Sequence, residues 1–121
     1  MPTTKVLIVD DDHNMVKLLT TLLTLDGFEV ITEARGAEVL PAIRKEKPNV
    51  VLMDVHLTNA DGLEILGRIR ADAAIAATPV IIASGRDVRE ECKRAGADDF
   101  ILKPYLPEKL TEALRTLATP S

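Results

Sequence analysis

Five short runs of aliphatic and aromatic residues recur along the chain, and they constrain its fold more than any other feature. Each run has at most four residues, which is too short for a helix, and most are rich in the Val and Ile that favour strands. Their starts are separated by 20 to 30 residues, which leaves room for a helix in each interval. The predicted strands are Val6–Val9, Phe28–Ile31, Val50–Met53, Val80–Ala83 and Phe100–Leu102.

The intervals between these runs carry helical periodicity. Apolar residues in 15–22 and again in 110–117 repeat at i, i+3, i+4 and i+7, which places them on one helix face. Shorter stripes lie in 63–69 and 88–95. The alternation of strand and helix predicts an α/β fold, with a parallel sheet covered by helices on both faces. The second run is the least apolar, so we expect it at an edge of the sheet.

Several residues mark expected element ends. Pro41 lies inside the predicted helix at 37–45, so that helix should start late or bend. Gly27 and Gly96 follow predicted helices, as C-terminal glycines do. Asp12 has the position of a helix N-cap. Asp87 and Glu90 have the spacing of a capping box.

Length and composition limit the function classes. A chain of 121 residues is the size of one domain, and residues 1–121 are interpreted as one. The formal charge is −4 with no run of Lys or Arg, which argues against nucleic-acid binding by this domain. No apolar run approaches the ~20 residues of a membrane span, and no secretory signal is evident. The single cysteine, Cys92, excludes an internal disulfide and suits the cytoplasm, where it is expected in the core.

Polar residues follow four of the five predicted strands. Three acids begin at Asp10, and the later strands are followed by Asp54, Ser84 and Lys103. Since the carboxyl ends of parallel strands share one edge of the sheet, these side chains should meet there. Each residue taken alone has an ordinary explanation as a turn, cap or surface charge. Four such explanations would have to coincide at four strand ends.

Clustered carboxylates need a cation or a proton. Two unit charges 4 Å apart repel by ~4 kcal/mol at an effective dielectric constant of ~20. Oxygen ligands without a second cysteine or a paired histidine favour Mg²⁺ or Mn²⁺ over zinc. The pattern therefore predicts a divalent-cation site at this edge.

In this order and spacing the motifs resemble the receiver domain of bacterial two-component response regulators, from Lys5 to about Leu117. The resemblance implies a flavodoxin-like (βα)5 fold with a five-stranded parallel sheet in the order 2-1-3-4-5. It is compatible with a stand-alone regulator or with a receiver taken from a longer protein. The matching segments are Val6–Asp12, Val51–Asp54 followed by Asp61–Glu64, Pro79–Gly85 and Ala95–Pro104.

The resemblance also implies a chemistry. Asp54 would accept a phosphoryl group from a sensor histidine kinase or a histidine phosphotransfer protein. Asp10 and Asp11 would hold Mg²⁺, which Mn²⁺ can replace, with Asp54 and the backbone carbonyl of His56 as further ligands. Lys103 would pair with the phosphoryl oxygens. The domain would catalyse only its own phosphorylation and dephosphorylation.

Further residues of the family pattern would transmit the effect of phosphorylation. Ser84 would move toward the phosphoryl group, Phe100 would change rotamer with it, and Pro104 would follow a cis peptide bond. The face formed by the fourth helix, fifth strand and fifth helix would then control an output domain or partner, or form a homodimer. His56 and Arg86 lie two positions beyond Asp54 and Ser84, where family members tune the phosphate lifetime.

The chain departs from the family pattern in two places that matter below. Thr58 stands where proline is usual, which loosens the loop after Asp54 but removes no ligand. Phe100 replaces the commoner tyrosine.

Two other functions remain open at this point. A phosphatase of the haloacid-dehalogenase type would use Asp10 and Asp12 as an Asp-x-Asp pair, but Asn14 does not fit its motif and Asp54 would have no role. A receiver-like interaction module that is never phosphorylated would have no need to keep Asp54 and Lys103. The cognate kinase and the regulated process cannot be read from the sequence.

Overall fold

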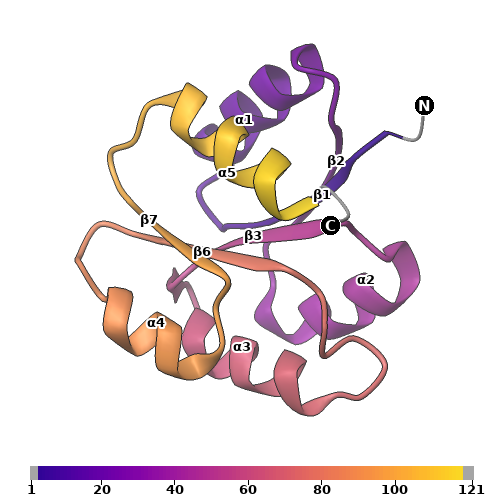
Figure 1. The fold of residues 1–121 in the computed structure, drawn as a ribbon, viewed down its shortest axis with the longest axis vertical. Coiled ribbons are helices and arrows are strands. Elements are labelled where there is room, and N and C mark those ends of the chain that lie inside the picture. Colours follow the sequence, from indigo (N-terminus) through magenta and orange to yellow (C-terminus); the bar gives the residue numbers. More distant parts are fainter. Residues whose placement is uncertain (1–2, 119–121) are drawn as a thin grey trace.

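The five predicted strands form one parallel sheet in the computed structural model, which describes residues 3–118; of the run residues, only Phe28 lies outside its strand. The order is β2-β1-β3-β6-β7 (Figure 1). This confirms the predicted α/β class and the doubly wound topology, with the least apolar run at an edge. The strands are β1 (Lys5–Val9), β2 (Glu29–Glu33), β3 (Val50–Asp54), β6 (Val80–Ser84) and β7 (Asp99–Leu102).

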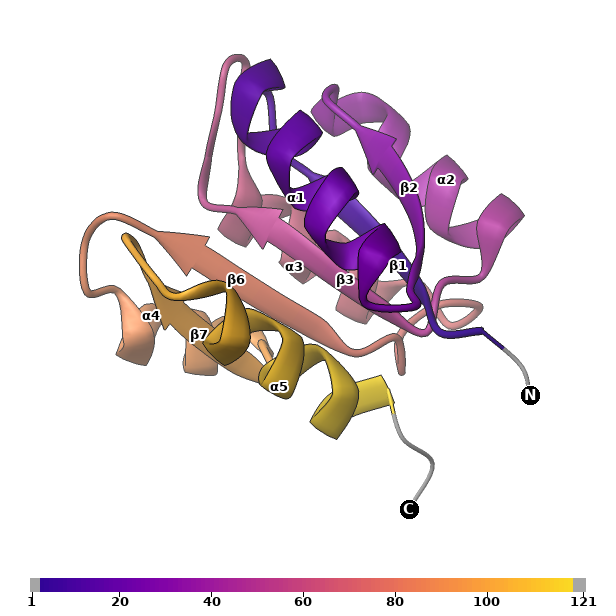
Figure 2. The same ribbon diagram turned by 90° about the horizontal axis from the view of Figure 1, so that it is seen from above.

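Helices cover both faces of the sheet, as Figures 1 and 2 show together. One face carries α1 (His13–Leu25) and α5 (Pro107–Ala118). The other carries α2 (Val39–Glu46), α3 (Gly62–Ala71) and α4 (Arg89–Ala95). Within residues 3–118, no helix combines the length and the apolar character needed to cross a membrane.

The pleat of the central strands supplies two hydrophobic cores, one on each face. In β1, Val6 and Ile8 pack in the core beneath α1 and α5, whereas Leu7 and Val9 pack in the core beneath α2, α3 and α4. This is the two-residue alternation expected of a strand that is buried on both sides. Cys92 is buried in the second of these cores, as predicted. The rigid sheet fixes the positions of the residues that follow its strands.

Most of the expected element ends are confirmed. A 3₁₀ turn, η1 (Gly36–Glu38), precedes α2, so Pro41 falls in the first helical turn, where its missing N–H has no helical partner to lose. The side chain of Asp12 caps α1 by accepting from two backbone N–H groups. Gly27 and Gly96 have φ angles of 93° and 101°, which glycine adopts more readily than other residues.

Two local features differ from the expectations. The capping box at Asp87 is wrong, because α4 begins one residue later, with Val88 at its N-cap; Asp87 instead accepts from the backbone N–H of Arg89 at 3.2 Å. A small antiparallel hairpin of β4 (His56–Leu57) and β5 (Ala60–Asp61) also follows β3. Its strands have two residues each, too few to produce a period in the sequence.

Candidate functional site

One lysine joins two of the strand ends. Asp10 follows β1, Asp54 is the last residue of β3, and Lys103 follows β7. The Lys103 Nζ lies 3.1 Å from Asp54 Oδ2 and 3.7 Å from Asp10 Oδ2. The backbone of Lys103 is held as well, because its N–H donates to the Ser84 carbonyl at 2.8 Å. Three strands thus bring one ammonium group and two carboxylates together.

Burial sets the electrostatics of this trio. Asp10 is only 7% exposed, and burial raises the pKa of its carboxyl group, with the charge of Asp54 adding to the effect. Burial alone would lower the pKa of Lys103. The hydrogen bond to Asp54 and the charges of Asp54 and Asp10 outweigh that effect, so the pKa of Lys103 lies above its ordinary value. The ammonium group therefore stays charged between the two acids.

The backbone holds the second oxygen of each carboxylate. Asp10 Oδ1 accepts from the N–H of Asp12 at 2.9 Å, and Asp54 Oδ1 accepts from the N–H of His56 at 3.4 Å. Each acid is thus oriented by a neighbour in its own loop while its other oxygen faces Lys103. Fixed carboxylates of this kind suit a reaction that depends on positioning.

Gly62 allows α3 to start directly against the end of β3. Its N–H donates to the Val55 carbonyl at 2.7 Å. A Cβ at this position would collide with the carbonyl oxygen of Asp54 and lie 3.0 Å from the Cα of Val55. In the sequence, Gly62 is part of the Asp61–Glu64 segment that resembles the family pattern after Asp54. The Asp61-Gly62 pair is visible in the sequence. The need for glycine there arises from the contact between α3 and the end of β3, which the sequence alone does not show.

Asp11 does not join the trio. Thr58 donates both its backbone N–H and its hydroxyl group to Asp11 Oδ2, and this hydroxyl contact is the main reason that the pKa of Asp11 is lowered. Across residues 3–118, no three side chains of the His, Cys, Asp and Glu types gather in a way that could hold a metal ion. The structure therefore unites two of the three acids expected together, and the contact made by Thr58 was not predicted.

The expected switch residues lie near the ends of β6 and β7. Ser84 is fully buried, and its hydroxyl oxygen accepts from the N–H of Arg86 at 3.1 Å. Phe100 is also buried, with the guanidinium of Arg89 5.3 Å from its ring centroid. The peptide bond between Lys103 and Pro104 is cis, as the resemblance implies. Arg86 and His56, the expected lifetime-tuning residues, are both exposed.

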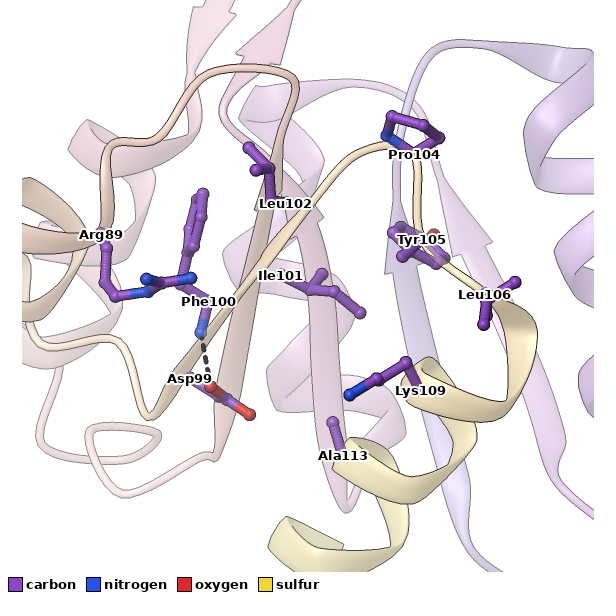
Figure 3. Close-up of a pocket in the computed structure, with 10 residues that line it drawn as sticks. All are labelled: Arg89, Asp99, Phe100, Ile101, Leu102, Pro104, Tyr105, Leu106, Lys109 and Ala113. Carbon is purple, nitrogen blue, oxygen red and sulfur yellow. Dashed lines mark hydrogen bonds between the residues drawn. The ribbon is translucent and has the colours of Figure 1, made fainter.

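A hollow of about 460 Å³ lies between β7 and α5, with Phe100, Leu102, Tyr105 and Leu106 among its lining residues (Figure 3). Burial raises the pKa of the Tyr105 hydroxyl group. None of Asp10, Asp54 and Lys103 lines this hollow, so the hollow is separate from the charged trio. Two lining residues connect the hollow to β6 through strand pairing: Phe100 pairs with Ile82 in the middle of β6, and Leu102 pairs with Ser84 at its end.

The donor set fits a magnesium ion. Asp10 and Asp54 offer hard carboxylate oxygens that are balanced by only one ammonium group. Mg²⁺ in proteins commonly takes one or two carboxylates and keeps several waters. Asp11 would join them as a further ligand only after its two hydrogen bonds with Thr58 had broken.

Comparison with known proteins identifies relatives over nearly the whole chain. The family model for the response regulator receiver domain matches residues 6–115. A protein described as "probable transcriptional regulator ycf27" from Pyropia yezoensis is 35% identical over 118 residues, which cover 93% of this chain and 46% of that protein. The chain spans about half the length of the curated relatives it matches.

Solved structures share the fold. The BeF₃-activated N-terminal receiver domain of RstA from Klebsiella pneumoniae is 28% identical, with a TM-score of 0.89 over 97% of this chain and 100% of that one. The receiver domain of the sensor histidine kinase PA1611 from Pseudomonas aeruginosa, with a magnesium ion coordinated in its active-site cleft, is 23% identical, with a TM-score of 0.87 over 97% and 98%. On its sequence match and its fold, this chain belongs to the response regulator receiver domain family.

Proposed function

We propose that this domain accepts a phosphoryl group on Asp54 and so relays a signal in a two-component system. The observation that carries the proposal is the ion-paired trio, in which Lys103 Nζ lies 3.1 Å from Asp54 and 3.7 Å from Asp10. An oxygen nucleophile beside a fixed cation suits phosphoryl transfer, where catalysis consists mostly of positioning and charge neutralisation. Family membership makes a histidine kinase or a phosphotransfer protein the donor.

In the proposed reaction, a carboxylate oxygen of Asp54 forms a bond to the phosphorus of a phosphohistidine while the P–N bond breaks. The bonding electrons return to the imidazole of the donor, and an acyl phosphate remains on Asp54. Lys103 is placed to pair with the phosphoryl oxygens and offset their charge. Water later attacks the phosphorus, the bond between the phosphorus and the Asp54 oxygen breaks, and inorganic phosphate leaves as the carboxylate is regenerated. The domain therefore catalyses only its own phosphorylation and dephosphorylation.

Asp10 and Asp54 would hold Mg²⁺ or Mn²⁺, joined by Asp11 and by the backbone carbonyl of His56. The ion supplies charge neutralisation between the carboxylate and the phosphoryl group when it is bound. The magnesium ion reported in the related PA1611 receiver domain supports this assignment.

Ser84 and Phe100 provide the proposed response. The Ser84 hydroxyl group would leave the N–H of Arg86 and donate to a phosphoryl oxygen, which changes the packing at the end of β6. Phe100 would then turn with it, beside the cis peptide bond before Pro104, and the face of α4, β7 and α5 would change. The curated relatives are longer than this chain, and one is described as a transcriptional regulator, so we assign that face to control of an attached domain, a partner or a homodimer.

His56 and Arg86 are assigned to the lifetime of the acyl phosphate. Both are exposed and lie two positions beyond Asp54 and Ser84, where their side chains would hinder an approaching water. Alanine at both positions should shorten the lifetime, because water would then reach the phosphorus more easily. An unchanged or longer lifetime of the double variant would overturn this assignment.

The main alternative, a phosphatase with an Asp-x-Asp pair, is disfavoured by the position of Asp12. Its carboxylate accepts from the N–H groups of Asn14 and Met15 at 3.1 Å and caps α1, so it is committed to the helix. Asp54, which that chemistry would not need, is the acid closest to Lys103.

Labelling with acetyl phosphate and Mg²⁺ tests the proposal. We expect one phosphate per chain on the wild type and none on Asp54→Asn. Asp26→Asn is the matched control, because Asp26 ends α1 and pairs with Arg115 instead. Undiminished labelling of Asp54→Asn, or continuous turnover of a generic phosphomonoester, would refute the proposal.

A further inference from the structure

Thr58 makes two contacts to a single oxygen of Asp11. Its backbone N–H and its hydroxyl group both donate to Asp11 Oδ2 across 47 positions of sequence. Hydrogen bonds to a charged acceptor are stronger than those between neutral groups. Asp11 is therefore tied to the loop that follows β3.

This tie keeps Asp11 apart from the other two acids. Lys103 forms ion pairs with Asp10 and Asp54. Among residues 3–118, no ion pair joins Lys103 to Asp11. In the described part of the chain, the three acids accordingly form no metal-ready group.

The β4–β5 hairpin determines where Thr58 sits. His56 pairs with Asp61 and Leu57 pairs with Ala60, so residues 58 and 59 form the turn between them. The turn carries the N–H and the hydroxyl group of Thr58 toward Asp11. Valine here would keep the shape and the N–H but lose the hydroxyl group, and proline would lose both donors.

We propose that Thr58 is a positioning residue that holds Asp11 out of the metal site. A divalent cation can bind Asp11 as a third acid only when the hydrogen bonds from Thr58 to Asp11 break. The inference rests on the proposed function only in placing the cation at Asp10 and Asp54. Because the cation and Thr58 compete for one carboxylate, Thr58 weakens the apparent affinity for Mg²⁺. The turn at 58–59 is released when the cation binds.

Calorimetric titration of the full chain with Mg²⁺ tests this competition. Thr58→Val should bind Mg²⁺ about tenfold to a hundredfold more tightly than the wild type, the effect of removing one hydrogen bond to a charged group. Thr58→Ser keeps both donors and should stay within about twofold of the wild type. Thr116→Val is the matched control: the Thr116 hydroxyl group donates to the Glu112 carbonyl on α5, and its loss should leave the affinity unchanged.

The effect must also depend on Asp11. In an Asp11→Asn background, Thr58→Val should no longer change the affinity, since a double-mutant cycle isolates the pairwise contribution. Unchanged or weaker Mg²⁺ binding by Thr58→Val, or a gain that persists without Asp11, would overturn the inference.

Labelling separates this outcome from failure of the proposed function. If Asp54 is phosphorylated but the Mg²⁺ affinity does not change with the residue at position 58, the inference fails and the proposed function stands. If the affinities follow the expected order but Asp54 takes no phosphate, the proposed function fails and the competition between Thr58 and the cation stands.

Discussion

An ionised carboxyl group at Asp10 serves the proposed metal site but destabilises the fold. The carboxyl group is buried, and its raised pKa means that the fold disfavours the ionised form. An acid of this kind lowers stability as pH rises from the ordinary carboxyl range through its folded-state pKa, and the loss is complete above that value. We predict that Asp10→Asn, without Mg²⁺ at neutral pH, raises the free energy of unfolding by about 1 kcal/mol. Urea denaturation measures it, and the gain should shrink in acid.

Asp11→Asn is the matched comparison for that prediction. Its pKa is lowered by the hydroxyl group of Thr58, so this acid stabilises the fold above its ordinary pKa, and amidation should give no gain. Equal stabilisation by both variants would show that relief of general acidic repulsion, not burial of Asp10, is the cause.

Gly62 gives a second prediction at the scale of one residue. Gly62→Ala places a methyl group against the carbonyl oxygen of Asp54, so the start of α3 must move away from β3. We expect a loss of about 2 kcal/mol in urea denaturation, within the range for overpacked sites, and slower labelling of Asp54.

Gly67→Ala is the control within the same helix. Nothing lies within 4 Å of a Cβ added at Gly67, and alanine in a helix interior should gain up to about 1 kcal/mol. A similar response of the two variants would exclude close approach at Gly62 as the cause.

Among the elements, those with a repeating pattern were predictable from the sequence. The strands and the long helices followed from runs and stripes of apolar residues, and strand order followed from the family resemblance. The β4–β5 hairpin was missed because strands of two residues have no period. The strand-end acids and Lys103 were found from their positions, whereas the contact of Thr58 with Asp11 depends on the approach of two loops that local sequence does not encode.

Arg70 connects α3 to the loop before β6 and to the segment between α4 and β7. From α3 it donates to the carbonyls of Gly96, Ala76 and Thr78 and to the carboxylate of Asp98, at 2.7 to 2.9 Å. Arg70→Met would leave these acceptors without their partner. We predict a loss of about 2–3 kcal/mol in urea denaturation, with faster amide exchange at the end of α4.

Arg68→Met is the matched control for Arg70, two residues earlier in the same helix. Arg68 pairs with Glu64 at 2.8 Å, but its side chain is 68% exposed, and exposed pairs of this spacing contribute about 0.5 kcal/mol or less. If the two variants lose equal stability, removal of positive charge from α3 explains the effect and the connection made by Arg70 does not.

For the whole molecule, the site exists only when the sheet is assembled. Asp10, Asp54 and Lys103 are far apart in sequence and meet because β1, β3, β6 and β7 lie in that spatial order. The unfolded chain cannot hold the three groups in this arrangement. A cation that binds them therefore recognises the folded state in preference to the unfolded one, so binding and folding are linked.

Magnesium should accordingly stabilise the entire domain. At a free concentration of 100 times Kd, binding to the folded state alone adds about 2.7 kcal/mol to the free energy of unfolding. The urea midpoint should rise while the slope of the transition stays constant, because the surface exposed on unfolding does not change. Asp54→Asn should lose most of this gain and Asp26→Asn should keep it. An equal gain from NaCl at matched ionic strength would show that screening of the −4 net charge, and not occupation of the site, stabilises the fold.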